Sequence, residues 1–306
     1  MELLGKTNID FIGKRNISFV ISSIIAILGI IGIIQIARGN ANMGIDFSGG
    51  TSLQLKFTKP LLIADARAAL HKNGIAKADL QEIKDGNKLL IKIDKNTSLS
   101  LGKASVAVQT AFKKEFTDNA FTVESSTEIG PSIGDKLRKD TLVAVVISLL
   151  GIILYIAWRF DFKFGIGATL ATLHDCLAMF AVFYVMNKEI NLLFITAVLT
   201  IAGYSLTDTV VVFDRIRENL HKNLKSSMQN TFNLSINEVL SRTIVTSFTV
   251  FLASSSLFFF GGEVIHDFSF ALLIGVLVGT YSSVFVASPI VVILENRALA
   301  KQGAKA

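Results

Sequence analysis

Six stretches of the sequence are long, apolar and nearly free of charge, and they limit the possible folds more than any other feature. Only Asp175 and Asp208 interrupt them. An α-helix rises ~1.5 Å per residue, so each stretch is long enough to cross the ~30 Å hydrocarbon core of a bilayer. The sequence therefore predicts an α-helical polytopic membrane protein with six transmembrane helices, over residues 16–37, 141–158, 164–187, 190–213, 243–262 and 268–294.

The composition agrees with a membrane protein and argues against several other classes. Hydrophobic residues make up 51% of the chain, charged residues only 18%, and the mean hydropathy is +0.55. The single cysteine, Cys176, cannot form an internal disulfide or a multi-thiolate metal site. The four histidines lie in different segments, and the sequence has neither a phosphate-binding G-x-x-x-x-G-K motif nor an H-E-x-x-H motif. We therefore expect no enzyme activity, no metal and no cofactor.

Lysine and arginine residues beside the six stretches fall almost entirely in alternate connecting segments. Cytoplasmic loops of membrane proteins carry an excess of these residues, so both termini are predicted to lie in the cytoplasm. Orientation thus accounts for the net charge of +6, and no nucleic-acid partner is expected. The predicted parts are residues 1–42 (cytoplasmic N-terminus and first helix), 43–140 (extracytoplasmic domain), 141–294 (helices two to six) and 295–306 (cytoplasmic tail).

Residues 43–140 carry half of the chain's charged residues, which is typical of a soluble domain. Alternating apolar residues predict its strands, and an Ala-rich segment and a capped segment predict its helices. Their order is βαββαβ, that of a small α+β ferredoxin-like domain. The predicted elements are strand 51–57, helix 62–72, a weaker strand near Leu80, a hairpin turn at 85–87, strand 89–93, helix 99–116 capped by Ser98, and strand 121–124.

This domain has no catalytic constellation in its sequence, so we expect it to act in docking. The edge strands of a sheet can accept an extended polypeptide as an additional strand. Crosslinkers placed along residues 51–57 would test whether an extended polypeptide docks there.

Asp208 lies within the fourth stretch, where a charged group costs ~2.5–3.5 kcal/mol even on the lenient insertion scale. Arg242 begins the fifth stretch from the cytoplasmic side, and Thr246 follows it by one helical turn. We expect Asp208 and Arg242 to pair. Protonation of Asp208 would then release Arg242 and let the helices repack, which suits proton coupling. The alternative is that Asp208 serves packing and that Arg242 reaches the cytoplasmic phosphates.

Asp175, near the middle of the third stretch, is a second candidate for proton coupling. A purely structural role, with its carboxylate satisfied by a neighbouring helix, stays equally open. Because adjacent residues on a helix point in different directions, we expect His174 to face another side.

Small residues recur every four positions in the sixth stretch and form a ridge that allows another helix to approach closely. The neighbour is expected to be a helix of the same chain, although a partner subunit is an alternative. The residues of this ridge are Gly275, Gly279, Ser283 and Ala287.

Several motifs together resemble a known family. Asp46-Phe47-Ser48-Gly49-Gly50 follows the first stretch, and residues 203–219 read GYSLTDTVVVFDRIREN. Alone, the first motif is a glycine-rich turn. With the second, it makes the chain closely resemble the SecF family, the smaller membrane subunits of the bacterial SecD–SecF protein-export complex. The resemblance extends to His174-Asp175, Ser241-Arg242-Thr243, Phe260-Gly261-Gly262 and Gly279-Thr280-Tyr281-Ser282-Ser283.

The resemblance implies a subunit of the bacterial cytoplasmic (inner) membrane that is related to the resistance-nodulation-division transporters. Such a subunit pairs its six helices with six from SecD in the lipid bilayer and associates with the SecY channel. In that family, proton flow through the helices moves extracytoplasmic domains that help draw an unfolded polypeptide outward late in translocation. The implied proton-coupling residues are Asp208 and Arg242, with protons as the coupling ion. Thr246 is added from helical spacing alone.

Two other functions stay open at this point. A proton-coupled exporter of small molecules would use the same kind of intramembrane acid, although such exporters resemble much larger chains with two soluble domains. A non-transporting scaffold subunit would keep Asp208 for packing. A scaffold should tolerate the near-isosteric change Asp208→Asn, whereas a proton carrier should not.

Overall fold

The computed structural model describes residues 5, 7–76, 78–83, 87–94, 102–222 and 227–303. The chain forms two compact units. One comprises Met1–Asn42 and Ala144–Ala306, and the other comprises Met43–Val143. The predicted boundary at residue 140 lies inside one continuous helix, α5 (Pro131–Arg159), which contributes to both units.

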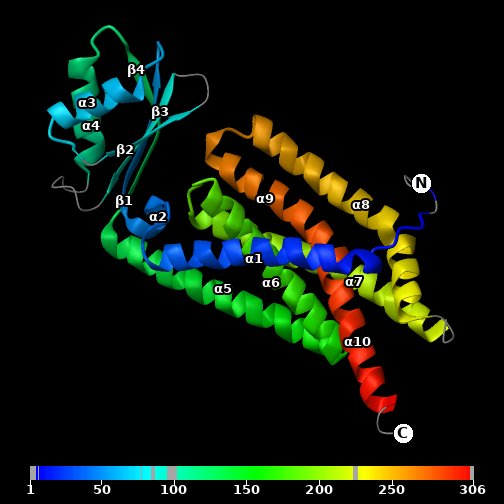
Figure 1. Cartoon of the computed structure of the whole chain (residues 1–306). Coiled ribbons are helices and arrows are strands. Elements are labelled where there is room, and N and C mark those ends of the chain that lie inside the picture. The colour runs from blue at the N-terminus through cyan, green and yellow to red at the C-terminus, as the bar shows by residue number, and fades with distance from the viewer. Residues whose placement is uncertain are drawn as a thin grey trace. The chain divides into compact units, whose positions relative to one another are not determined.

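The six predicted transmembrane helices are confirmed: six helices are long and apolar enough to span a membrane (Figure 1). Several begin earlier than predicted, because polar turns extend the helices beyond their apolar stretches. The sixth span, Val264–Ala298, is built from three successive elements. The helices of this unit besides α5 are η1 (Ile12–Lys14), α1 (Arg15–Ala37), α6 (Phe162–Val185), α7 (Leu192–Lys222), α8 (Met228–Phe260), α9 (Glu263–Ser282), η2 (Ser283–Ala287) and α10 (Ser288–Gly303).

Helix α6 is the most buried of the six spans and packs against α1, α7 and α9. Glycines allow α1 to approach it closely: a Cβ atom at Gly29 would lie 2.2 Å from the carbonyl oxygen of Leu177. Near the other end of α6, the ring of Phe164 packs edge-on against Phe213 of α7, with 5.0 Å between centroids. Helices α5 and α8 are the least buried, and their exposed side chains are mainly apolar. Glycine therefore brings α1 close to α6, whereas aromatic rings fill the contact between α6 and α7.

The sixth span is interrupted by η2, a π-helical segment, where a continuous helix was predicted. Pro289 lies just after it and has no N–H to donate to the preceding turn, which accounts for the break. The hydroxyl of Ser288 donates to the carbonyl oxygen of Ser283 at 3.0 Å and so satisfies one acceptor there. π-Helical segments often occur at functional sites.

The second unit contains an antiparallel sheet of order β2-β3-β1-β4 with two helices against one face, which confirms the ferredoxin-like prediction. Its core contains the side chains of Leu53, Leu55 and Phe57, which alternate along β1 with polar residues. The elements are α2 (Ile45–Ser48), β1 (Gly50–Phe57), α3 (Ile63–Lys72), β2 (Ala78–Ile83), β3 (Lys88–Asp94), α4 (Ala104–Glu115) and β4 (Phe121–Ile129).

Three details of this unit differ from the predictions. The strand at 51–57 was expected to offer an edge, but β1 lies between β3 and β4, so the outer strands are β2 and β4. Strand β4 extends beyond the predicted 121–124, because its polar continuation pairs with β1. Helix α4 begins at Ala104. The predicted cap Ser98, residues 99–101 and most of the turn at 85–87 lie outside the described residues.

Candidate functional site

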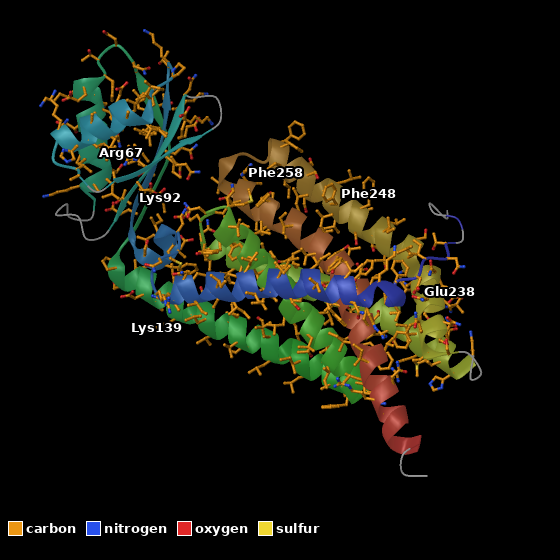
Figure 2. The ribbon with its side chains drawn as sticks, viewed as in Figure 1. Arg67, Lys92, Lys139, Glu238, Phe248 and Phe258 are labelled. Carbon is orange, nitrogen blue, oxygen red and sulfur yellow. The ribbon has the colours of Figure 1, made fainter. Side chains whose placement is uncertain are left out.

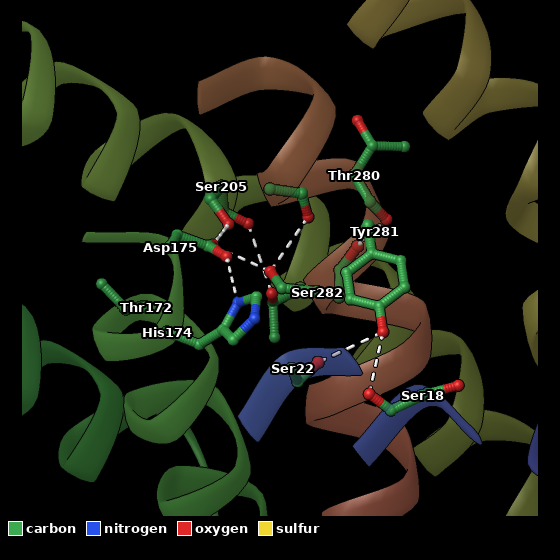
Figure 3. Close-up of polar contacts among 12 residues, drawn as sticks. Ser18, Ser22, Thr172, His174, Asp175, Ser205, Thr280, Tyr281 and Ser282 are labelled. Carbon is green, nitrogen blue, oxygen red and sulfur yellow. Dashed lines mark hydrogen bonds and ion pairs between the residues drawn. The ribbon is translucent and has the colours of Figure 1, made fainter. Parts of the chain in front are cut away.

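Asp175 is the more deeply buried of the two intramembrane acids, with 0% of its surface exposed. Its Oδ2 atom accepts hydrogen bonds from two hydroxyls: Ser205 of α7 at 2.5 Å and Ser282 of α9 at 2.8 Å. Asp175 therefore joins three helices through a single carboxylate oxygen (Figure 3).

His174 contacts the same carboxylate, contrary to the prediction that it faces another side. Its Nδ1 atom lies 3.2 Å from Asp175 Oδ1. The two Cβ atoms do diverge, but the imidazole is long enough to reach back over the adjacent side chain (Figure 3). We call His174, Asp175, Ser205 and Ser282 the Asp175 network.

Tyr281 connects the neighbourhood of this network to α1. Its ring lies beside the His174 ring, with 6.1 Å between centroids and 37° between planes. Its hydroxyl donates to the carbonyl oxygen of Ser18 at 3.0 Å and lies 3.1 Å from Ser22 Oγ. Ser18 and Ser22 are both buried, one turn apart on α1. Figure 3 shows Tyr281 with its hydroxyl on the α1 serines and its ring beside His174.

Asp208 is also buried, with 6% of its surface exposed, and it lies on α7 three residues after Ser205. Its Oδ2 atom accepts a hydrogen bond from Ser247 of α8 at 3.2 Å. The hydroxyl of Ser247 in turn accepts from Thr280 of α9 at 2.7 Å and from Tyr204 at 3.4 Å. We call Tyr204, Asp208, Ser247 and Thr280 the Asp208 network.

The expected ion pair between Asp208 and Arg242 is not formed: within the described part of the chain, no ion pair of 4.0 Å or less joins them. Both Arg242 and Thr246 are exposed. The buried stripe of α8 contains Thr243 and Ser247, each one residue further along, and one residue is about 100° around a helix. Arg242 and Thr246 therefore lie at the exposed edge of this stripe, close enough to interact with the Asp208 carboxyl although no ion pair joins it to Arg242.

The outward surface of α8 is wide and largely apolar. Phe248 is 54% exposed and extends from it (Figure 2), and Ile244 and Leu252 are also exposed. Arg242 and Thr246 are thus polar groups at the edge of an apolar surface that this chain leaves uncovered.

The small-residue ridge packs inside the chain. A Cβ atom at Gly275 would lie 2.4 Å from Ile201 Cγ1, and one at Gly279 would lie 2.9 Å from Ser205 Cβ, so both glycines press against α7. Ser283 and Ala287 are fully buried in η2. The ridge therefore holds α9 close enough for Ser282 to reach Asp175.

The Asp46–Gly50 motif forms helix α2 and the turn into β1. Gly49 has φ +69°, a conformation that favours glycine, and its Cβ position is 3.3 Å from the Cα atom of Pro131 at the start of α5. Phe47 is buried, and Ser48 donates to the carbonyl oxygen of Gly44 at 3.0 Å. The motif thus forms a tight junction among α2, β1 and the start of α5.

Comparison with known proteins identifies the family to which this chain belongs. Residues 42–61 match the SecD/SecF GG motif, and residues 108–297 match the family described as protein export membrane protein SecD/SecF, C-terminal. The chain belongs to the SecD/SecF protein-export family. Its resemblance to SecF is thereby confirmed, and together with the six spans it identifies a multi-pass membrane protein of this family.

The relatives support this assignment over the whole length. The chain is 53% identical to the protein translocase subunit SecF of Thermodesulfovibrio yellowstonii, over 99% of this chain and 100% of the relative. It is 38% identical to SecF of Calditerrivibrio nitroreducens, over 97% of each chain. The crystal structure of SecDF, a translocon-associated membrane protein from Thermus thermophilus, matches with a TM-score of 0.84 and 34% identity, over 95% of this chain. The chain spans 39% of that SecDF chain.

The hydroxyl partners of the two acids were not predicted from the sequence. Ser205, Ser247 and Ser282 are ordinary residues in transmembrane helices, where hydroxyls often bond to their own backbone. The signal that could have found Ser282 is the polar run from Thr280 to Ser283 within an otherwise apolar span. Among the described residues, no group of three or more potential metal ligands is assembled. The site instead consists of two buried carboxyl groups, each with hydroxyl donors.

Proposed function

We propose that this chain acts with SecD as an accessory subunit of the Sec translocase, and that the pair uses the proton motive force to promote late translocation of secreted polypeptides across the cytoplasmic membrane. The observation that carries the proposal is the buried Asp208 carboxylate, which bonds to Ser247 between two membrane helices. The chain that carries Asp208 belongs to the SecD/SecF protein-export family. Asp208 is the proposed proton carrier.

Burial and charge explain why Asp208 suits this role. The ionised carboxylate loses hydration inside the bundle and keeps only the hydroxyl donors near it, so its protonation state governs how the helices pack. One proton that crosses about 100 mV releases ~2.3 kcal/mol, enough to shift a two-state equilibrium about fiftyfold. Proton binding at Asp208 would therefore bias the arrangement of α7 against α8.

Arg242 and Thr246 would complete the proton-coupling site from the outward surface of α8. A guanidinium beside lipid is costly, so an uncovered Arg242 favours a protein neighbour. The SecDF protein from Thermus thermophilus is much longer than this chain, which spans 39% of it. SecD is the proposed neighbour, and its helices would cover the apolar surface around Phe248 and shield Arg242 within reach of Asp208.

We further propose that both termini lie in the cytoplasm and that the unit Met43–Val143 lies outside it, where it contacts the emerging polypeptide beside the SecY channel. Its outer strand β4 is the better docking edge, because β1 is paired on both sides. Crosslinkers belong at exposed β4 positions such as Val123 and Thr127 rather than along residues 51–57. No catalytic step and no coupling ion other than protons are proposed.

The test is export of a secreted protein in cells that make this chain with its SecD partner, measured with and without a proton gradient. Asp208→Asn should abolish the gradient-dependent part of export at matched membrane levels. Asp267→Asn is the control, because Asp267 pairs with Lys188 at 2.7 Å and belongs to neither acid network. Unchanged gradient-dependent export in Asp208→Asn would leave Asp208 as a packing residue and favour a scaffold role.

A further inference from the structure

His174 has an unusual environment for a histidine in a membrane helix. The residue is 95% buried, since only 5% of its surface is exposed, and its Nε2 atom has no hydrogen-bond partner in the described part of the chain. Its Nδ1 atom faces the carboxylate of Asp175 at 3.2 Å. When Asp175 is ionised its carboxylate only accepts, so Nδ1 then carries the shared proton and Nε2 of the neutral ring is an unsatisfied acceptor.

The groups around this pair are polar but uncharged. Helix α7 contributes Ser205 and helix α9 contributes Ser282, both to Asp175 Oδ2. Helix α9 also contributes Tyr281, whose hydroxyl is engaged by α1. Cys176, the next residue of α6, is the remaining titratable neighbour on that helix. The closest acid along α7 is Asp208, which bonds to Ser247 in a separate network.

We infer that His174 and Asp175 form a second proton-binding site, separate from Asp208, and that Tyr281 is a positioning residue that transmits its occupancy to α1. This inference rests on the proposed function, since it adds a site to the same proton-driven subunit. The ligand is a proton. The unpartnered Nε2 atom and the three-donor carboxylate are the two features that support it.

The proton transfer balances within the pair. An arriving proton bonds to His174 Nε2, and Nδ1 passes its own proton to Asp175 Oδ1. The imidazole is neutral again as the opposite tautomer, and the carboxylate has become a carboxylic acid whose O–H donates back to Nδ1. Two hydroxyl donors remain on Oδ2, so the acid keeps its contacts with α7 and α9.

The new tautomer changes the surroundings of the ring. Nε2 now carries a hydrogen, and a buried donor without an acceptor is unfavourable, so the ring is driven to turn. Tyr281 packs against this ring and its hydroxyl bonds to Ser18 and Ser22 of α1. A turn of the ring therefore shifts Tyr281 against α1, the helix that precedes the unit Met43–Val143 along the chain.

Infrared difference spectroscopy tests proton binding directly on the full chain with SecD in lipid vesicles. Lowering the pH should produce a carbonyl band of a protonated carboxylic acid that persists in Asp208→Asn and disappears in Asp175→Asn. If Asp175→Asn does not accumulate, Ser282→Ala replaces it: loss of one donor to Oδ2 should move this band to higher frequency. A carboxylic-acid spectrum that neither substitution alters would overturn the second site.

The role of Tyr281 has its own readout. Tyr281→Phe keeps the ring but removes the bonds to Ser18 and Ser22, so the Asp175 band should remain while gradient-dependent export is lost. Tyr184→Phe is the control, because that tyrosine meets α1 through its ring near Gly32. Wild-type export by Tyr281→Phe would overturn the link to α1. The infrared result does not depend on export, so failure of the proposed function at Asp208 would be recognised separately.

Discussion

Thr280 and Ser282, two residues apart on α9, belong to different acid networks. Ser282 donates to Asp175 at 2.8 Å, whereas Thr280 donates at 2.7 Å to Ser247, which itself donates to Asp208. Successive positions on a helix point in different directions, so one short segment of α9 reaches both acid networks. The segment ends at the π-helical element η2, where a change of register requires little further distortion. A shift of α9 would therefore alter both acids together.

Removing the hydroxyl of Ser247 should impair the Asp208 network without unfolding the bundle. Ser247→Ala deletes the donor to Asp208 and the acceptor for Thr280, so we expect a loss of gradient-dependent export at normal membrane levels. Ser254→Ala is the matched control, since Ser254 is equally small and buried on the same helix. Equal export by the two variants would show that the Ser247 bond does not matter for coupling.

Adding one methyl group at Gly279 should destabilise the contact between α9 and α7. The new Cβ atom would lie 2.9 Å from Ser205 Cβ, and overpacking of this kind costs ~1–3 kcal/mol. Gly203→Ala on α7 has open space around the added atom and should unfold like wild type. The midpoint of thermal unfolding should be measured for both variants in the complex with SecD in lipid. A midpoint of Gly279→Ala equal to that of wild type would contradict the close packing of α9 on α7.

The turn after α2 should tolerate alanine poorly at Gly49. Its φ of +69° and ψ of 162° lie in a region that is essentially restricted to glycine and costs another residue ~1–3 kcal/mol, and the added Cβ would press on Pro131 at 3.3 Å. Gly74 has φ +83° and open space around its Cβ position, so Gly74→Ala is a substitution at positive φ without a steric contact. Hydrogen exchange of the β1 amides should speed up more in Gly49→Ala than in Gly74→Ala. Equal effects would contradict the additional strain expected at Gly49.

Protonation of Glu124 at low pH should destabilise the sheet of the unit Met43–Val143. Hydrogen bonds from Gln54 at 2.9 Å and Lys88 at 3.0 Å lower the pKa of this carboxyl below its ordinary value. A lowered folded-state pKa gives stability that is present above the unfolded pKa and lost as the pH falls through the folded one. Hydrogen exchange of β1 and β4 should therefore quicken below about pH 4 in wild type. Glu124→Gln should weaken this pH dependence, and an unchanged profile would contradict it.

Much of the architecture follows from the sequence. A long apolar stretch without charged residues predicts a membrane span, and the alternation of apolar and polar residues along a strand predicts which face of the sheet is buried. The burial of Asp175 and Asp208 was also predictable, since a carboxylate in hydrocarbon must face protein or water. The orientation of Arg242 was not, because it depends on the rotation of α8 against α7, which spacing along one helix cannot supply. The contact of His174 with Asp175 could not be predicted either, because it depends on the side-chain conformation of His174. The break at η2 depends on how the helix accommodates Pro289.

Proton flux tests the central claim most directly. Sealed vesicles that contain the chain with SecD, a pH-sensitive dye and an imposed proton gradient should conduct protons when an unfolded secreted polypeptide is supplied. The account predicts that Asp208→Asn abolishes this flux and that Asp267→Asn leaves it intact. Flux in Asp208→Asn equal to that of wild type, or no wild-type flux above protein-free vesicles, would contradict proton coupling through Asp208.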